Sequence, residues 1–333
     1  MAKEFYIIDK KNIPEFIEKL QYDNDIFMLT EGLLYQKYSQ GCDMHNVNLD
    51  TVRAMHPVKL FFFYNNELVH KDPVQSRKKV ILGVKNCDLK ALAVLDKIFL
   101  TSGDVIDPFY KQSRDNTIIV SSDCNEPGKN CFCTMVGNKP YADAGFDLNF
   151  SISHNNYVVE IGSEKGEKLI KLYPTIFHRL SDDNKLKGRD KDRDNAIKKI
   201  ADINKEFAKL FGENLQDIVK KNFNSNKWKE ESVNCVQCAG CNNICPSCYC
   251  FFLSEEKDAS RIRFWDACHN TGYARVAGGA NARPKLYERF RNRYQCKFNY
   301  RKTNFNVYSC TGCGRCIEVC PGKIDIRKVI NTL

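Results

Sequence analysis

The pattern of apolar and polar positions divides the chain into an N-terminal part with alternating strand and helix signals and a C-terminal part with mainly helical ones. Short apolar runs predict strands at residues 59–64, 78–84, 116–122 and 157–162. Helical patterns at 88–99 and 164–173 lie between and after them. Strands that alternate with helices are typical of α/β domains, and we place such a domain at residues 1–180.

A region of different character follows at residues 181–230. Its first part, 181–195, is rich in charge and predicts an exposed connection. The next segment, 196–223, predicts a packed amphipathic helix or pair of helices, because apolar side chains recur at helical spacing. These side chains are Ile197, Ile200, Ile203, Phe207, Leu210 and Phe211.

Two cysteine motifs in the remaining part, residues 231–333, share one spacing. The pattern C-x-x-C-x-x-C-x-x-x-C-P begins at Cys235 and again at Cys310. This spacing is typical of two-cluster ferredoxins, in which the fourth cysteine of each motif reaches the other cluster. We therefore predict two 4Fe-4S clusters with crossed ligands. One set is Cys235, Cys238, Cys241 and Cys320, and the other is Cys310, Cys313, Cys316 and Cys245. Two structural zinc sites are the alternative.

The segment between the motifs predicts a largely helical ferredoxin-like domain. Residues 254–270 and 282–295 mix charged and apolar positions with few helix breakers. Residues 257–302 hold 12 Lys or Arg against 3 Asp or Glu. They predict a basic surface, including Arg289, Arg291 and Arg293, that offsets the negative charge of the clusters and docks an acidic partner. A solvated helix face is the alternative, and no motif indicates nucleic-acid binding.

Four of the five cysteines in the predicted α/β domain, all except Cys42, form a further group of candidate ligands. Cys87 and Cys124 each follow a predicted strand, and Cys131 and Cys133 come shortly afterwards. Open α/β sheets bind ligands at the carboxyl ends of their strands, so these four thiols predict a third 4Fe-4S cluster, well away from the ferredoxin-like domain. Buried inert cysteines and a zinc site are the alternatives. For Cys248, Cys250 and Cys268 we expect a packing or tuning role, and no histidine pattern indicates a metal site.

Composition indicates in which cellular compartment these cysteines act and which chemical role they have. The chain has 333 residues, 17 cysteines and a formal net charge of +10. It lacks a signal-like N-terminus and any apolar run of about 18 residues, so we expect a cytoplasmic protein without a membrane span. Closely spaced cysteines in a reducing compartment are more often metal ligands than disulfides. No glycine-rich nucleotide-binding loop follows a strand.

An ordered series of segments then resembles a known family. "NLDTVRAMHPVKLFFF" (48–63), "GVKNCDLKAL" (83–92), "DCNEPGKNCFCT" (123–134), "CPSCYC" (245–250), "WDAC" (265–268) and "CTGCGRCIEVCPGKIDI" (310–326) carry the resemblance. The chain resembles the iron-sulfur beta subunit of cytoplasmic NiFe hydrogenase and sulfhydrogenase complexes, and the related iron-sulfur subunit of anaerobic sulfite reductase. It departs from that pattern at Ala239, where the second motif has glycine, and at "KNCD", where many hydrogenase subunits have "RPCD".

The resemblance implies a role in anaerobic electron transfer. Such subunits pass electrons between a flavoprotein subunit, which carries FAD and reacts with NAD(P), and a catalytic hydrogenase or reductase subunit. We therefore expect an electron-transfer subunit of an oxidoreductase complex without catalytic residues of its own. A thiol or disulfide reductase that uses Cys248, Cys250 or Cys268 is one alternative. A zinc-stabilised binding module is another.

Overall fold

The computed structural model describes residues 4–39, 47, 49–69, 72–73, 77–101, 103, 105–181 and 183–333. Within them, an eight-stranded mixed sheet has the order β3-β2-β5-β6-β7-β8-β1-β9. Its strands are β1 (Phe5–Asp9), β2 (Asn24–Leu29), β3 (Tyr35–Lys37), β5 (Lys78–Val84), β6 (Thr117–Ser122), β7 (Leu148–Ser153), β8 (Asn156–Ile161) and β9 (His178–Arg179). The central strands β2, β5, β6 and β7 are parallel. Three of the four predicted strands therefore lie in this sheet.

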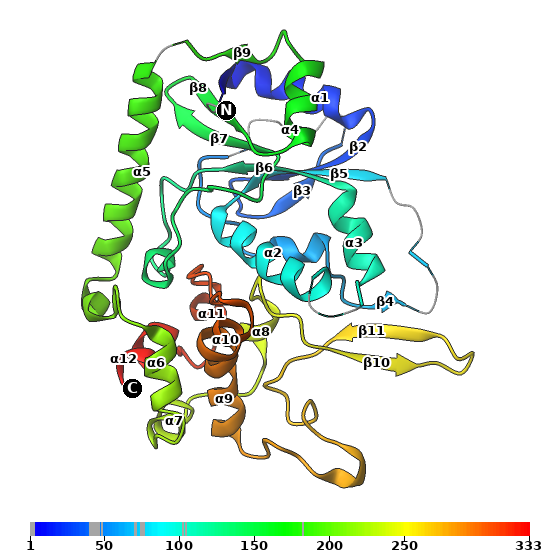
Figure 1. Cartoon of the computed structure of the whole chain (residues 1–333), viewed down its shortest axis with the longest axis vertical. Coiled ribbons are helices and arrows are strands. Elements are labelled where there is room, and N and C mark those ends of the chain that lie inside the picture. The colour runs from blue at the N-terminus through cyan, green and yellow to red at the C-terminus, as the bar shows by residue number, and fades with distance from the viewer. Residues whose placement is uncertain are drawn as a thin grey trace.

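Helices cover both faces of the sheet (Figure 1). They are α1 (Ile13–Gln21) and α4 (Glu164–Leu172) on one face, and α2 (Asn86–Phe99) and α3 (Pro108–Asp115) on the other. Strand β5 is buried on both sides, since Val80 packs in the core beneath α1 and Ile81 in the core beneath α2. Two-sided burial explains why central parallel strands read as continuous apolar runs.

The C-terminal part packs around a separate apolar core. Its elements are α6 (Leu215–Lys221), α7 (Lys227–Glu231), α8 (Gly240–Asn243), α9 (Leu286–Tyr294), a π-helical segment η7 (Gln295–Tyr300), α10 (Arg301–Phe305), α11 (Arg315–Glu318) and α12 (Ile326–Asn331). Trp228, Tyr294 and Phe298 are fully buried at its centre. None of the helices in the described ranges is both long and apolar enough to cross a bilayer.

A β-hairpin replaces the helix predicted at 254–270. Strands β10 (Phe251–Glu255) and β11 (Arg261–Trp265) pair antiparallel and project from the body of the molecule (Figure 1), and β4 (Glu67–Leu68) pairs with β11. Arg263 is buried and forms ion pairs with Glu67 and Asp107. Because a charged residue occupies this buried strand position, the alternation typical of a strand is hidden in the sequence.

The strand predicted at 59–64 is also wrong. Residues Val58–Phe61 form a 3-10 turn (η3), in which the Phe62 N–H donates to the Lys59 carbonyl oxygen over 3.0 Å. Val58, Lys59, Phe62 and Phe63 are all buried, so burial does not alternate along this run as it would in a half-buried strand. Short runs of this kind carry no period that separates a strand from a helical turn.

The exposed connection predicted at 181–195 is part of a long helix, α5 (Asp183–Ile203), which runs from the sheet towards the C-terminal part (Figure 1). Its buried stripe is Arg193, Ala196 and Ile200. Arg193 donates to Asp123 over 2.7 Å, and Asp123 precedes Cys124 in the chain. Because the first residue of the stripe is an arginine, the spacing of apolar residues alone does not predict a helix in this part of the sequence.

Candidate metal centres

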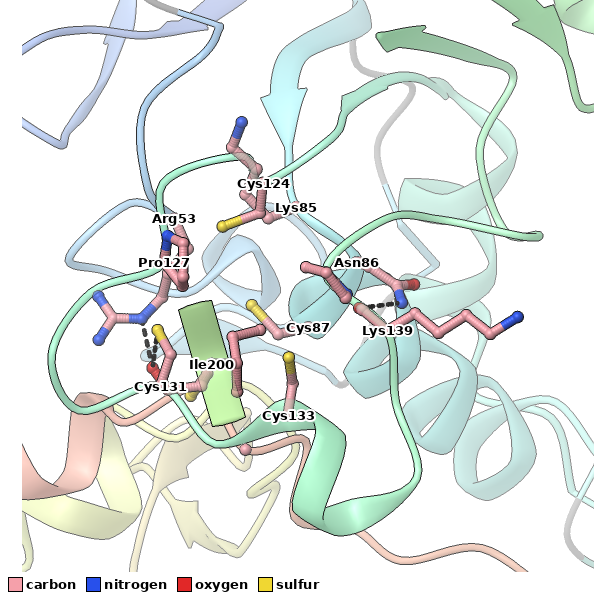
Figure 2. Close-up of a pocket in the computed structure, with 13 residues that line it drawn as sticks. Arg53, Lys85, Asn86, Cys87, Cys124, Pro127, Cys131, Cys133, Lys139 and Ile200 are labelled. Atoms are coloured by element: carbon pink, nitrogen blue, oxygen red, sulfur yellow. Dashed lines mark hydrogen bonds between the residues drawn. The ribbon is translucent and has the colours of Figure 1, made fainter. Parts of the chain in front are cut away.

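Four cysteines of the α/β part line one cavity. Cys87 lies in the first turn of α2 after β5, and Cys124 follows β6. Cys131 lies on the loop before the short 3-10 segment η4 (Cys133–Val136), and Cys133 is the first residue of that segment. Figure 2 shows the four side chains around the cavity, as the positions of Cys87 and Cys124 at the carboxyl ends of neighbouring parallel strands predict. The structure thus brings together all four residues of the predicted third site.

These thiols are unsuited to act as free nucleophiles. Burial raises the pKa of Cys131 to about 12 and also raises the pKa of Cys87, Cys124 and Cys133. Buried thiols of this kind stay protonated and inert at neutral pH unless a metal provides positive charge. Lys85, which also lines the cavity, is fully engaged with the Leu49 carbonyl, the Ser122 hydroxyl and the Asp123 carbonyl.

This cavity adjoins the second cysteine motif, so the prediction that it lies well away from the ferredoxin-like domain is wrong. Cys313 lines the same cavity. The Phe132 N–H donates to the Gly312 carbonyl oxygen over 2.8 Å, and a Cβ at Gly312 would lie 2.4 Å from Cys133 Cα. The two loops are therefore in backbone contact, which only glycine permits at this position.

A second cavity is lined by Cys235, Cys238, Cys241 and Cys320. Three of these residues come from the first motif and the fourth ends the second motif, so this group has the crossed composition that the spacing predicts. Cys316 of the second motif also borders this cavity. His269, to which no sequence pattern pointed, lies with Nε2 3.1 Å from the Cys235 sulfur. Burial, with Arg293 and Arg289 nearby, lowers the pKa of His269 to about 4.

The remaining predicted group lies between the two cavities. Cys245 and Cys310 are buried, and burial, with Cys316 and Cys245 nearby, raises the pKa of the Cys310 thiol to about 12. Cys313 and Cys316 belong to this group and also line the cavities on either side. The second motif therefore adjoins both cavities, and we refer to the first cavity, this group and the second cavity, in that order, as a row.

The two motifs share one backbone conformation despite different residues. Gln237 and Ala239 flank Cys238 with φ values of 59° and 54°, and Gly312 and Gly314 flank Cys313 with values of 69° and 75°. The left-handed region costs a non-glycine residue roughly 1–2 kcal/mol. The first motif therefore keeps the same turn with Ala239 in place of glycine, and this departure from the family pattern does not change the loop.

Part of the predicted basic surface is buried, whereas Arg291 is half-buried, and Lys257, Arg261, Arg275 and Lys285 are exposed. Arg289 and Arg293 are 3% and 5% exposed, so the prediction that they form a docking surface is wrong. Arg293 lines the second cavity, and although burial opposes it, the Cys241 and Cys316 sulfurs raise its pKa. This geometry supports the expectation that basic side chains offset the negative charge of the cysteine groups. These basic side chains, however, lie inside the protein and not on its surface.

Lys297 is a second internal cation, presented by the π-helical segment η7. Its Nζ lies 2.9 Å from the Cys245 sulfur and 3.5 Å from the Cys248 sulfur. Hydrogen bonds from Cys248 and Lys297, with the Lys297 charge, hold the pKa of the Cys245 thiol well below its ordinary value. Single π-turns in helices frequently occur at functional sites. Here the turn places a charged donor on a predicted cluster ligand.

We expect Lys297→Met to make the reduction potential of one cluster more negative by roughly 60 mV, a tenfold change for a one-electron couple. Loss of the hydrogen bond and the positive charge at Cys245 disfavours the added electron. A redox titration followed by EPR measures the shift. Lys302→Met, which removes the same charge from the neighbouring helix α10, serves as the control. Unchanged potentials at full iron content would contradict this role for Lys297.

The donor sets fit iron-sulfur clusters better than zinc. Within the described part of the chain, no group of three or more His, Cys, Asp or Glu side chains is arranged to hold a metal ion. A zinc ion gathers its thiolates about 2.3 Å from one point, whereas a cubane distributes them over four irons. Groups composed of cysteines, in loops closed by tight glycine contacts, are suited to the larger cofactor.

Cys248, Cys250, Cys268 and Cys296 lie outside the predicted ligand sets. Cys248 hydrogen-bonds to Cys245, and Cys250 to Cys268. Cys296 belongs to no sequence motif, and it lies close enough to Cys268 to contribute to the raised pKa of that thiol. Contact with Cys245 supports the expected tuning role for Cys248. Cys250 and Cys268 instead form a hydrogen-bonded pair with each other.

Comparisons with known proteins agree with the cysteine motifs. Residues 234–324 match the family model described as a 4Fe-4S dicluster domain. The chain is 31% identical to sulfhydrogenase 2 subunit beta of Pyrococcus furiosus, over 96% of this chain and 95% of that protein. It is 25% identical to F420-dependent formate dehydrogenase subunit beta of Methanocaldococcus jannaschii, over 52% of this chain and 40% of that protein.

Proposed function

Since the chain belongs to the family of iron-sulfur hydrogenase beta subunits, we propose that it relays electrons through three 4Fe-4S clusters between two partner subunits. One partner is a flavoprotein subunit that carries FAD and reacts with NAD(P). The other is a catalytic hydrogenase or reductase subunit. The chain's own part is to bind the clusters, hold them in a fixed order and shield them from water.

The row of cysteine groups carries this proposal. Cys313 lines the cavity of the first group and Cys316 that of the last, so the middle group adjoins both neighbours. Clusters held in such a row provide short steps for single electrons from one part of the chain to the other. The dicluster match at residues 234–324 supports two of the clusters. The third rests on Cys87, Cys124, Cys131 and Cys133.

We expect protein purified without oxygen to contain about twelve irons per chain, four for each of three clusters. Its broad visible absorbance should bleach on reduction by dithionite. Metal analysis and absorbance spectra of the same sample provide the measurement. An iron content of about eight would support the two clusters of the cysteine motifs and contradict the third. Stoichiometric zinc without the absorbance would contradict the proposed function.

A further inference from the structure

Cys250 and Cys268 lie at the base of the β10–β11 hairpin, on its two arms. Cys250 directly precedes β10, and Cys268 follows β11 by three residues. Phe251 pairs with Trp265 in the antiparallel ladder, and the Asp266 N–H donates to the Cys250 carbonyl oxygen over 2.9 Å. The hairpin thus fixes the two backbones side by side, and the two thiols are hydrogen-bonded.

The two thiols differ in exposure and in acidity. Cys268 is 8% exposed, whereas Cys250 is half-buried. The hydrogen bond from Cys268, with a further one from Tyr273, lowers the pKa of Cys250 to about 6. The same pair interaction, together with burial, raises the pKa of Cys268. A more accessible thiolate beside a buried thiol is the arrangement from which redox-active disulfides form.

One side chain separates this pair from a predicted cluster ligand. The Asn242 side chain lies between two sulfurs, with Oδ1 3.4 Å from Cys241 and Nδ2 3.4 Å from Cys268. Cys241 lines the second cavity, so the pair lies directly outside that site. The Asn242 amide therefore connects Cys268 to that site.

We propose that Cys250 and Cys268 form a redox-active dithiol that exchanges two electrons with the neighbouring 4Fe-4S cluster. Opening of the disulfide breaks one S–S bond, takes up two electrons and one proton, and leaves the Cys250 thiolate beside the Cys268 thiol. The reductant is the reduced cluster beside Cys241, which passes electrons one at a time, and the proton comes from water. Closure reverses each of these changes. The inference rests on the proposed function, because it needs a cluster as the electron source.

The test uses the full chain with its clusters, prepared without oxygen, and the variants Cys250→Ser and Cys268→Ser. Cys296→Ser is the matched control, since it removes a thiol from the same region outside the pair. Samples poised oxidised or reduced are denatured in alkylating agent and chelator, digested, and analysed by mass spectrometry for linked peptides. A reductive titration counts the electrons that each protein takes up.

We expect a Cys250–Cys268 cross-link in the oxidised sample and its loss on reduction. The wild type and Cys296→Ser should each take up about two more electrons than either pair variant, at equal iron content. Absence of the cross-link with equal electron counts would overturn the proposal, and so would loss of iron in Cys250→Ser, because the thiol would then be a ligand. A wild-type chain without iron would instead refute the proposed function, and the cross-link can be measured even then.

Discussion

The double variant Cys131→Ser, Cys133→Ser is expected to lose about four irons per chain, the content of one cubane, and to keep the EPR signals of the other clusters. Both residues line the first cavity, and burial keeps their thiols protonated when no metal is present. Serine is close in size, so the backbone contact between Cys133 and Gly312 should persist. Iron analysis with EPR spectroscopy measures the loss.

The same variant should stop electron transfer between the two partner subunits while both still bind. The first cavity is at one end of the row, and no other cysteine group in the described α/β part provides a step there. Cys296→Ser again serves as a control, because it removes a half-buried thiol from outside the three groups. Retention of all iron and of the transfer rate in the double variant would mean that Cys131 and Cys133 are structural.

The grouping of the cysteines could be predicted from the sequence because it depends on local spacing and strand position. The motif at Cys235 requires only tight turns between its cysteines, and Cys87 and Cys124 follow central strands whose apolar runs are unambiguous. In both cases neighbouring residues determine where the thiols lie. Ligation by these residues remains a prediction.

The cations around the sites could not be predicted, because their burial depends on contacts between distant segments. Lys297 and Arg293 occur in a basic segment that looks like a solvated surface. Each is buried and faces a cysteine sulfur from a distant segment, Lys297 that of Cys245 and Arg293 that of Cys241. Arg263 and Arg193 mislead in the same way, since hydropathy counts them as polar although both are buried in ion pairs. Sequence patterns identify polar residues but not their partners.

The ion pair between Asp88 and Arg315 joins the α/β part to the second cysteine motif. Both side chains are 1% exposed, and the guanidinium donates to the two carboxylate oxygens over 3.0 and 2.7 Å. Arg315 Nε also donates to the Ala54 and Met55 carbonyls, at 3.0 Å each. Asp88 follows Cys87 and Arg315 precedes Cys316, so the pair fixes the distance between two predicted cluster sites.

We expect Asp88→Asn to lower the free energy of unfolding by about 3–5 kcal/mol, because it leaves the Arg315 charge buried without a counter-charge. The double variant Asp88→Asn, Arg315→Met should recover part of this loss, since it removes both charges. Urea unfolding without oxygen, followed by circular dichroism, measures the change. Asp115→Asn breaks the exposed pair with Lys111 and should cost no more than about 0.5 kcal/mol. Equal midpoints for Asp88→Asn and Asp115→Asn would show that the buried pair does not hold the two parts together.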